Sequence, residues 1–264
     1  MTSHELSGKC ALVTGASSGL GADFARQLAD FGTHLILVAR RTDRLEQLKS
    51  DILKSHTVKI DVIPLDLLAD GAPRKLYDDI KARGLTVDVL VNNAGYGMHG
   101  PFLKQPWERQ EAMLRLDMLV VTELTRLFVP DMVERNHGHV LQISSAIAYQ
   151  PAPTYAAYAA AKSYVLLFGE ALKFELRKTN VNCTVLSPGI TATEFLEVAG
   201  QRPTLYQRLF MMPSDAVVRT GLKAMLARKP SVIPGLGNKL LAFGVRLMPR
   251  RALTRVAYFL MKYG

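Results

Sequence analysis

The 264-residue sequence predicts an α/β fold, a single-domain Rossmann-type doubly wound parallel sheet of about seven strands with helices on both faces. Three observations predict it. Short apolar, β-branched runs alternate with longer helical patterns, as in consecutive βαβ units. A glycine-rich turn follows the first of these runs and opens the first helical pattern. No repeat, low-complexity tract or Pro/Ser-rich linker interrupts the chain, so one domain over 1–264 is expected.

The predicted strands are nearly continuous apolar runs, the pattern of strands covered by helices on both faces. They are expected in CALVTG (10–15), HLILVAR (34–40), VKIDVIPLD (58–66), VDVLVNNAG (87–95), HVLQISS (139–145), VNCTVLSPG (181–189) and, at the sheet edge, SVIPG (231–235). Leu20, Phe24, Leu28 and Phe31 recur at helical spacing after the first strand. The same criterion predicts helices over 19–31, 45–52, 75–83, 107–134 and 156–178.

Composition limits the class of protein. Hydrophobic residues make up 48% and charged residues 21% of the chain, as in ordinary globular proteins. The start MTSHELSGKC has no secretory apolar region, and no apolar run reaches the ~18 residues of a membrane-spanning helix, so a cytoplasmic location is expected. Cys10 and Cys183 lie in apolar runs and are expected to be buried, reduced thiols. The scattered histidines predict no metal site.

The basic charge lies at one end of the chain. The net charge is +10, and residues 216–264 hold ten Lys or Arg and no acidic residue, while the remainder has 23 of each sign. Residues 236–264 mix Arg with Leu, Phe and Met, which predicts a basic amphipathic C-terminal extension. This extension either contacts an anionic membrane surface, covers the sheet or a subunit interface, or is a solvated face. No recognition motif accompanies the charge, so nucleic-acid binding is not expected.

The turn TGASSGLG, residues 14–21, fits two different kinds of site. Read as G-x-S-x-G, it would be the nucleophile elbow of a serine hydrolase with Ser17 as nucleophile. That site needs an oxyanion-hole loop from an earlier strand, and only one strand precedes Ser17. A phosphate cradle needs only a tight turn at Gly15, close backbone approach at Gly19 and close helix packing at Gly21. The cradle is therefore favoured.

Four further motifs follow in order: NNAG (92–95), ISS (143–145), YAAAK (158–162) and SPG (187–189). With the glycine turn, they make residues 7–195 resemble the short-chain dehydrogenase/reductase family, in its subgroup with TGxxxGxG and YxxxK. The resemblance implies hydride transfer between a nicotinamide cofactor and a small-molecule carbonyl or alcohol. It also implies a homodimer or homotetramer that pairs through the helices at 107–134 and 156–178.

Tyr158 and Lys162 are four residues apart, so they share one face of a helix about one turn from each other. The ammonium group is expected to lower the pKa of the phenol from its usual ~10 toward neutrality, which would make Tyr158 the general acid/base. The neighbouring Tyr155 and Tyr164 have no lysine four residues later. The resemblance also assigns Lys162 to the nicotinamide ribose.

The resemblance assigns two more residues to this centre. Ser145 lies 13 residues before Tyr158, which is the family's separation, and would hold the substrate oxygen, with Ser144 as the weaker alternative. Asp117 stands where the family usually has an asparagine that helps a water relay protons to the lysine. Asp117 either takes this catalytic role or is only a helical acid, and its charge would alter the pKa of Tyr158.

The end of the second strand predicts NADP(H) as cofactor. An NAD enzyme offers Asp or Glu there, whereas this chain has Ala39 followed by Arg40 and Arg41, which favour a 2′-phosphate. The resemblance implies that Asp66 contacts adenine and that a threonine after the sixth strand meets the carboxamide or the phosphates. The expected cofactor-binding residues are Gly15, Ser17, Ser18, Gly19, Leu20, Gly21, Arg40, Arg41, Asp66, Asn93, Ala94, Gly95, Tyr158, Lys162, Pro188, Gly189, Thr191 and Thr193.

Residues 190–213 occupy the position of the family's substrate lid. Their apolar members are Phe195, Leu196, Val198, Leu205, Tyr206, Leu209, Phe210, Met211 and Met212. With Tyr96, Met98 and the loop AIAYQPAP, they predict a lipophilic substrate, although any amphipathic helix buries similar residues.

The sequence thus predicts an NADP(H)-dependent oxidoreductase that reduces a lipophilic carbonyl, or oxidises its alcohol, with Tyr158 as acid/base. Two alternatives remain open. One is a non-catalytic NADP(H)-binding regulator, in which Asp117 has abolished turnover. The other is a lipid-metabolising reductase held at a membrane surface by the C-terminal extension.

Overall fold

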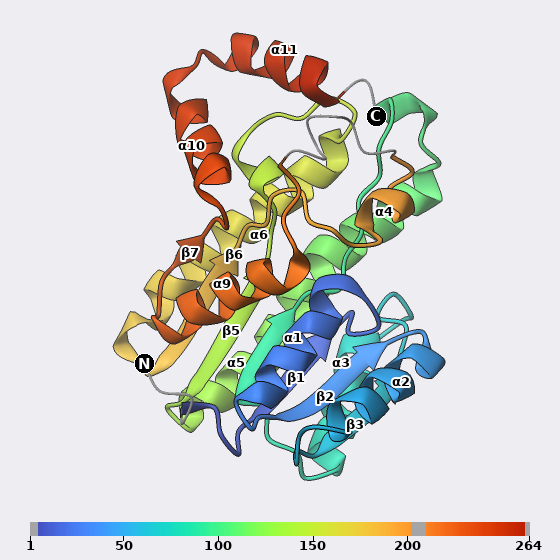
Figure 1. The fold of residues 1–264 in the computed structure, drawn as a ribbon, viewed down its shortest axis with the longest axis vertical. Helices are drawn as coiled ribbons and strands as arrows, with labels where there is room; N and C mark the ends of the chain where they lie inside the picture. Colours follow the sequence, from blue (N-terminus) through green and yellow to red (C-terminus); the bar gives the residue numbers. More distant parts are fainter. Residues whose placement is uncertain (1–4, 202–209, 262–264) are drawn as a thin grey trace.

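A parallel sheet forms the centre of the molecule, as predicted. The computed structural model describes residues 5–201 and 210–261, and its strands pair in the order β3-β2-β1-β4-β5-β6-β7 (Figure 1). The strands are β1 Cys10–Thr14, β2 His34–Ala39, β3 Ile60–Pro64, β4 Val89–Asn92, β5 Gly138–Ile143, β6 Val181–Leu186 and β7 Ser231–Val232. All six pairings are parallel. The order turns around between β1 and β4, which makes that position the topological switch point.

Helices cover both faces of the sheet, and each face has its own apolar core. One face carries α1 Gly19–Asp30, α2 Thr42–Leu53 and α9 Ser214–Leu226, and the other carries α3 Ala72–Ala82, α5 Val121–Glu134 and α6 Ala156–Glu175. Side chains alternate along each strand, so Val13 and Val91 enter the first core while Leu12 and Leu90 enter the second. Leu12 is paired with Leu90 in the register, which keeps both cores continuous across the switch point.

The remaining helices connect or extend this framework. They are α4 Trp107–Leu114, a π-helical stretch over Arg115–Val120, α7 Phe195–Val198, α10 Leu236–Gly244, α11 Arg250–Met261 and the 3₁₀ turns η2 Phe102–Lys104, η4 Ala146–Tyr149, η5 Leu176–Lys178 and η6 Val245–Leu247. Figure 1 shows α10 and α11 at one end of the molecule, beyond the sheet, with α2 and β3 at the other. No described helix is long and apolar enough to cross a membrane.

Three details differ from the sequence prediction. The strands end earlier, because the residues predicted at their carboxyl ends form loops at that edge of the sheet. The helix predicted over 107–134 contains the π-helical stretch. Cys183 is a buried free thiol as expected, but Cys10, at the start of β1, is only half-buried. Burial still raises the pKa of both thiols to about 12, so neither is a thiolate at neutral pH.

Candidate active site

A cavity of about 780 Å³ opens at the carboxyl ends of the strands. It lies at the switch point between β1 and β4, where open α/β sheets bind their ligands. The cavity is lined by every residue predicted from the sequence for catalysis or cofactor binding except Gly21 and Asp117. The separate sequence motifs therefore come together in one place.

The glycine turn is held in shape by the end of β4. Gly15 has a φ of 66°, and a Cβ there would lie 2.9 Å from the Cα of Ala94, so only glycine fits. The Nδ2 of Asn93 donates to the carbonyl oxygen of Thr14 at 2.9 Å and to that of Gly15 at 3.3 Å. A Cβ on Gly21 would overlap the Gly15 carbonyl oxygen. This packing brings the N-terminus of α1 to the cavity, where its free N–H groups suit a diphosphate.

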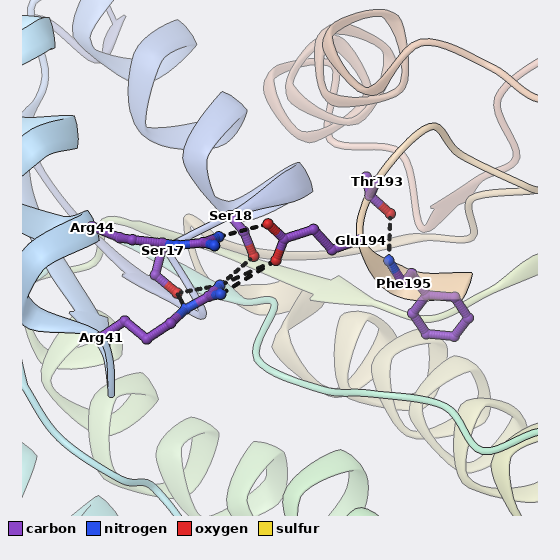
Figure 2. A network of polar contacts seen from close by, with 7 residues as sticks. All are labelled: Ser17, Ser18, Arg41, Arg44, Thr193, Glu194 and Phe195. Atoms are coloured by element: carbon purple, nitrogen blue, oxygen red, sulfur yellow. Dashed lines mark hydrogen bonds and ion pairs between the residues drawn. The ribbon is translucent and has the colours of Figure 1, made fainter. Parts of the chain in front are cut away.

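A charged cluster of Arg41, Arg44 and Glu194 lies beside the glycine turn, and Arg41 and Glu194 line the cavity (Figure 2). Arg41 Nη2 donates to Ser18 Oγ at 2.9 Å and to Ser17 Oγ at 3.2 Å. Glu194, directly before α7, pairs with Arg41 at 3.3 Å and with Arg44 at 2.6 Å. The hydrogen bond from Arg44 holds the pKa of Glu194 below its usual value, so this carboxylate is ionised at neutral pH. Ser17 thus accepts from an arginine, and no histidine that would act as its base is among the described residues that line the cavity, which favours the cradle over a hydrolase nucleophile.

The sequence patterns did not predict Glu194, which lines the cavity, or its ion-pair partner Arg44. Arg44 lies in the first turn of α2, three residues after Arg41, which precedes the helix, so this spacing was a usable signal. Glu194 is 150 residues away from Arg44 in the chain, and no local pattern connects the two. The predicted Arg40 is exposed and lines the same cavity.

Tyr158 and Lys162 lie on α6 and are buried, with exposed fractions of 7% and 6%. The Nζ of Lys162 lies 5.6 Å from the centre of the Tyr158 ring. The same Nζ lies 3.5 Å from Asp117 Oδ2 and donates to the carbonyl oxygen of Ile143 at 3.2 Å. The predicted pair therefore faces the cavity together, while the ammonium group is also paired with Asp117.

The pKa of Tyr158 shifts in the direction opposite to the prediction. Burial, reinforced by the negative charge of Asp117, raises the pKa of Tyr158 well above its usual 10.0, against a smaller lowering by the Ser145 hydroxyl. The predicted lowering by Lys162 is wrong for this arrangement, because the buried ring loses its hydration and the ammonium lies beside Asp117. Tyr158 is consequently protonated at neutral pH, which is the form that donates a proton.

The two serines after β5 have different hydrogen bonds. Ser145 precedes η4, and its Oγ accepts from the N–H of Ile147 at 3.3 Å. Ser144 is buried, and its Oγ donates to the Lys162 carbonyl oxygen at 2.7 Å. The Ser144 hydroxyl thus anchors α6, which favours Ser145 as the residue that contacts a substrate oxygen.

Asp117 lies in the π-helical stretch and is fully buried, with an exposed fraction of 0%. Single π-turns within α-helices are frequent at functional sites. Burial raises the pKa of Asp117 to about 6, although the nearby Lys162 ammonium group lowers it. This carboxyl group therefore changes its charge in the range near neutral pH, next to both residues of the predicted catalytic pair.

Replacing Asp117 with asparagine is expected to change how stability depends on pH. The folded pKa of about 6 lies above the unfolded value of 3.8, so the wild type loses stability as pH rises through this window. This difference between the folded and unfolded pKa corresponds to a change in the unfolding free energy on the order of 3 kcal/mol. Asparagine has no proton to lose, so the unfolding free energy of the variant relative to the wild type should increase by this order between about pH 4 and 7. Urea unfolding across that range measures it, and a pH-independent difference would contradict the assignment.

Phe195, in the described part of the predicted lid, lies against Tyr158. The ring centre of Phe195 lies 5.4 Å from that of Tyr158, and the ring centre of Tyr155 lies 5.9 Å from it. Met98 and Ala199 belong to the same apolar cluster. Of the other predicted lid residues, Phe210 is exposed, Met212 packs on the sheet core, and Leu205, Tyr206 and Leu209 lie outside the described residues. The surroundings of Tyr158 are thus largely apolar.

α10 forms one wall of the cavity, which the sequence analysis does not anticipate. Leu241, Ala242 and, just after α10, Val245 line it together with Asn238. Asn238 lies against Gly189, where any Cβ would overlap its side chain. The segment that begins at residue 236 is therefore part of the site.

Known proteins resemble this chain over most of its length. A family model described as short chain dehydrogenase matches residues 9–203. A short chain dehydrogenase from Pseudocercospora fijiensis is 34% identical over 228 residues, which cover 82% of this chain and 72% of that protein. The very-long-chain 3-oxoacyl-CoA reductase of Bos taurus is 34% identical over 203 residues, which cover 75% of this chain. This match spans 63% of the bovine protein, less than two thirds of its length.

A solved structure shares both the fold and part of the sequence. The short-chain dehydrogenase from Sphingobium yanoikuyae, in complex with NADPH, matches with a TM-score of 0.82 and 28% identity. The match covers 90% of this chain and 94% of that protein.

Proposed function

This chain belongs to the short-chain dehydrogenase family, and we propose that it is an NADP(H)-dependent oxidoreductase that reduces a lipophilic carbonyl, or oxidises its alcohol. The observation that carries the proposal is the convergence of three features in one cavity. These are the buried Tyr158 and Lys162 pair, the glycine turn and the ion pair of Arg41 with Glu194. Together they combine a proton donor with a place for a phosphorylated dinucleotide.

The residues of the cavity fit such a cofactor. The turn at Gly15 offers the N-terminus of α1 to a diphosphate. Arg41 and Arg44 would hold a 2′-phosphate, because a guanidinium group binds phosphate through two parallel hydrogen bonds. Asp66 and Thr193 also line the cavity, as an adenine contact and a phosphate or carboxamide contact require. When bound, the nicotinamide supplies or accepts the hydride.

Tyr158 supplies the proton in the direction of reduction. Its raised pKa keeps the phenol protonated at neutral pH, so it donates to a substrate oxygen on which negative charge develops. The Ser145 hydroxyl orients that oxygen, and the Lys162 ammonium stabilises the phenolate that remains. The ring of Phe195 excludes water, which strengthens these polar interactions.

The apolar part of the cavity supports a lipophilic substrate. Ile147, Tyr155, Phe195, Leu196 and Leu241 line it. Such a lining favours a carbonyl carried by a long alkyl chain or a ring system over a small polar one. The similarity to a reductase of very-long-chain 3-oxoacyl-CoA supports the same substrate class.

Replacing both Arg41 and Arg44 with alanine is expected to raise the Kd for NADPH by roughly 10- to 100-fold, because a 2′-phosphate would lose two charged hydrogen-bond donors. The Kd for NADH, which lacks this phosphate, should change little. Fluorescence titration with both cofactors measures the effect. Glu194→Gln is the matched variant, since it removes the carboxylate that competes for the same guanidinium groups and should tighten NADPH binding. An equal loss of affinity for NADPH and for NADH in the double variant would contradict the proposed preference for NADP(H).

The activity is tested by NADPH oxidation with a panel of carbonyl compounds. The panel contains short polar ketones, aliphatic and aromatic ketones, and a long-chain 3-oxoacyl thioester. Turnover is expected with lipophilic members, and faster than with the short polar ones. Turnover confined to small polar ketones would contradict the proposed substrate class.

A non-catalytic NADP(H)-binding regulator is the second candidate, and the buried Asp117 favours it. This carboxyl group pairs with Lys162 and raises the pKa of Tyr158, which opposes formation of the phenolate that alcohol oxidation requires. Tight NADPH binding without turnover on any member of the panel would support this candidate over the enzyme.

We also propose that the protein is a homodimer or homotetramer paired through α5 and α6. Leu167 and Phe174 are seven residues apart on α6 and are 67% and 65% exposed, so they form an uncovered apolar stripe. Pairing with the same stripe of a second copy would bury these side chains. Light scattering coupled to gel filtration gives the mass of the particle.

A further inference from the structure

The outer face of α10 carries an exposed apolar stripe. Leu236, Leu240, Phe243 and Leu247 follow one another at intervals of four, three and four residues, which places them on one side of the helix and its extension η6. Their exposed fractions are 73%, 62%, 60% and 74%. Isolated exposed leucines are ordinary, but a continuous apolar stripe of this length marks an interaction surface.

Basic side chains border this stripe. Lys239 and Arg246 are seven residues apart, so they lie on one edge of it, and both are exposed. α11 adds the exposed basic residues Arg250, Arg251 and Arg255 and the exposed aromatic residue Phe259. Residues 216–264 contain no acidic residue that would neutralise them. We name the exposed side chains of α10, η6 and α11 the C-terminal face.

We propose that the C-terminal face binds the surface of an anionic lipid membrane. An apolar stripe that enters the boundary between headgroups and acyl chains, bordered by Lys and Arg that reach anionic headgroups, is the pattern of an interfacial helix. Electrostatic attraction to anionic lipid complements the excess of positive charge. A second copy of the chain fits less well, because a two-fold contact through this face would bring like charges together.

Docking through this face would place the cavity at the membrane. The other side of α10 contributes Leu241 and Ala242 to the cavity wall, so one short helix separates the stripe from the site. A lipophilic substrate would then pass between the acyl chains and the cavity without crossing bulk water. This last step rests on the proposed function, whereas membrane binding by itself does not.

Sedimentation with vesicles tests the proposal, in the absence of cofactor and substrate. The full chain is mixed with vesicles of phosphatidylcholine alone, or of phosphatidylcholine with phosphatidylserine. The bound fraction should be at least about tenfold higher on the anionic vesicles, and it should fall at high salt. Equal binding to both vesicle types, or none to either, would overturn the proposal.

Two variants separate this face from the rest of the surface. Leu240→Glu combined with Phe243→Glu should reduce binding to anionic vesicles by about tenfold or more, since the stripe would carry two charges. Leu53→Glu is the matched control, because Leu53 is 44% exposed at the end of α2. α2 lies at the opposite end of the molecule from α10 and α11 (Figure 1). Undiminished binding of the double variant, or an equal loss in the control, would refute the assignment.

Two further outcomes separate membrane binding from a contact between protein copies, and separate the membrane proposal from the proposed function. If the double variant lowers the particle mass in gel filtration while the wild type does not bind anionic vesicles, the face contacts a second copy and the proposal is wrong. Neither substituted side chain lines the cavity, so any activity on a water-soluble ketone should be retained by the double variant. Vesicle binding without any reductase activity would sustain the membrane proposal and reject the proposed function.

Discussion

Replacing Tyr158 with phenylalanine is expected to lower kcat/KM for carbonyl reduction by about 10²- to 10⁴-fold, the range that a general acid contributes. The substitution removes only the hydroxyl group, so the ring packing with Phe195 and Tyr155 should persist. The Kd for NADPH should therefore change by no more than a few-fold. Steady-state NADPH oxidation and fluorescence titration measure the two quantities separately.

Tyr164→Phe is the matched control on the same helix. The Tyr164 hydroxyl is within 2.8 Å of the Thr122 hydroxyl, outside the cavity, and no lysine follows four residues later. This variant should keep wild-type turnover. Equal rates for Tyr158→Phe and the wild type would refute the proposed proton donor, and a large loss in Tyr164→Phe would show that the effect is structural.

Substituting alanine for Gly21 is expected to remove most activity by opening the phosphate cradle. The added Cβ would overlap the carbonyl oxygen of Gly15, which is backbone and cannot rotate away. Overpacking of this kind costs about 1–3 kcal/mol, which corresponds to a fall in Tm of roughly 3–10 °C for a chain of this size. The turn must shift relative to the diphosphate, so kcat/KM for NADPH should fall by on the order of 100-fold. Calorimetry measures the fall in Tm, and steady-state turnover at varied NADPH concentration measures the fall in kcat/KM.

Gly244→Ala provides the comparison for this substitution. A Cβ at Gly244 would meet no atom within 4 Å, and its φ of −58° is helical. Stability and cofactor binding should therefore be unchanged, or slightly improved, because alanine favours the helix. If Gly21→Ala behaves like Gly244→Ala, the close packing of α1 on the turn does not control cofactor binding.

The strands and the location of the site could be read from the sequence for a physical reason. The periodicity of strands and helices is local, so each βαβ unit can be predicted from a few dozen consecutive residues. Parallel strands end at one edge of the sheet, and the motifs around Gly15, Asn93, Ser145 and Gly189 each directly follow a strand. Their meeting in one cavity follows from the topology. The face shared by Tyr158 and Lys162 follows in the same way from helical spacing.

The ends of strands and the irregular turns inside helices were less predictable from the sequence. The π-helical stretch around Asp117 inserts an extra residue into a helical turn. The spacing of apolar residues over 107–134 does not predict this insertion. β7 retains only Ser231–Val232 of its predicted run.

By itself, the sequence determined the doubly wound sheet, the glycine turn and the meeting of the predicted motifs at one cavity, because these depend on patterns within single elements. Only the tertiary structure decided the charge state of the centre. Desolvation depends on the complete packing around Tyr158 and Asp117, and it reversed the expected shift in the pKa of Tyr158. Packing likewise brought Glu194 to Arg41 and made α10 both a cavity wall and an exposed apolar face. Contacts between segments so far apart in the chain have no local signature, since they arise only when separate elements are folded against one another.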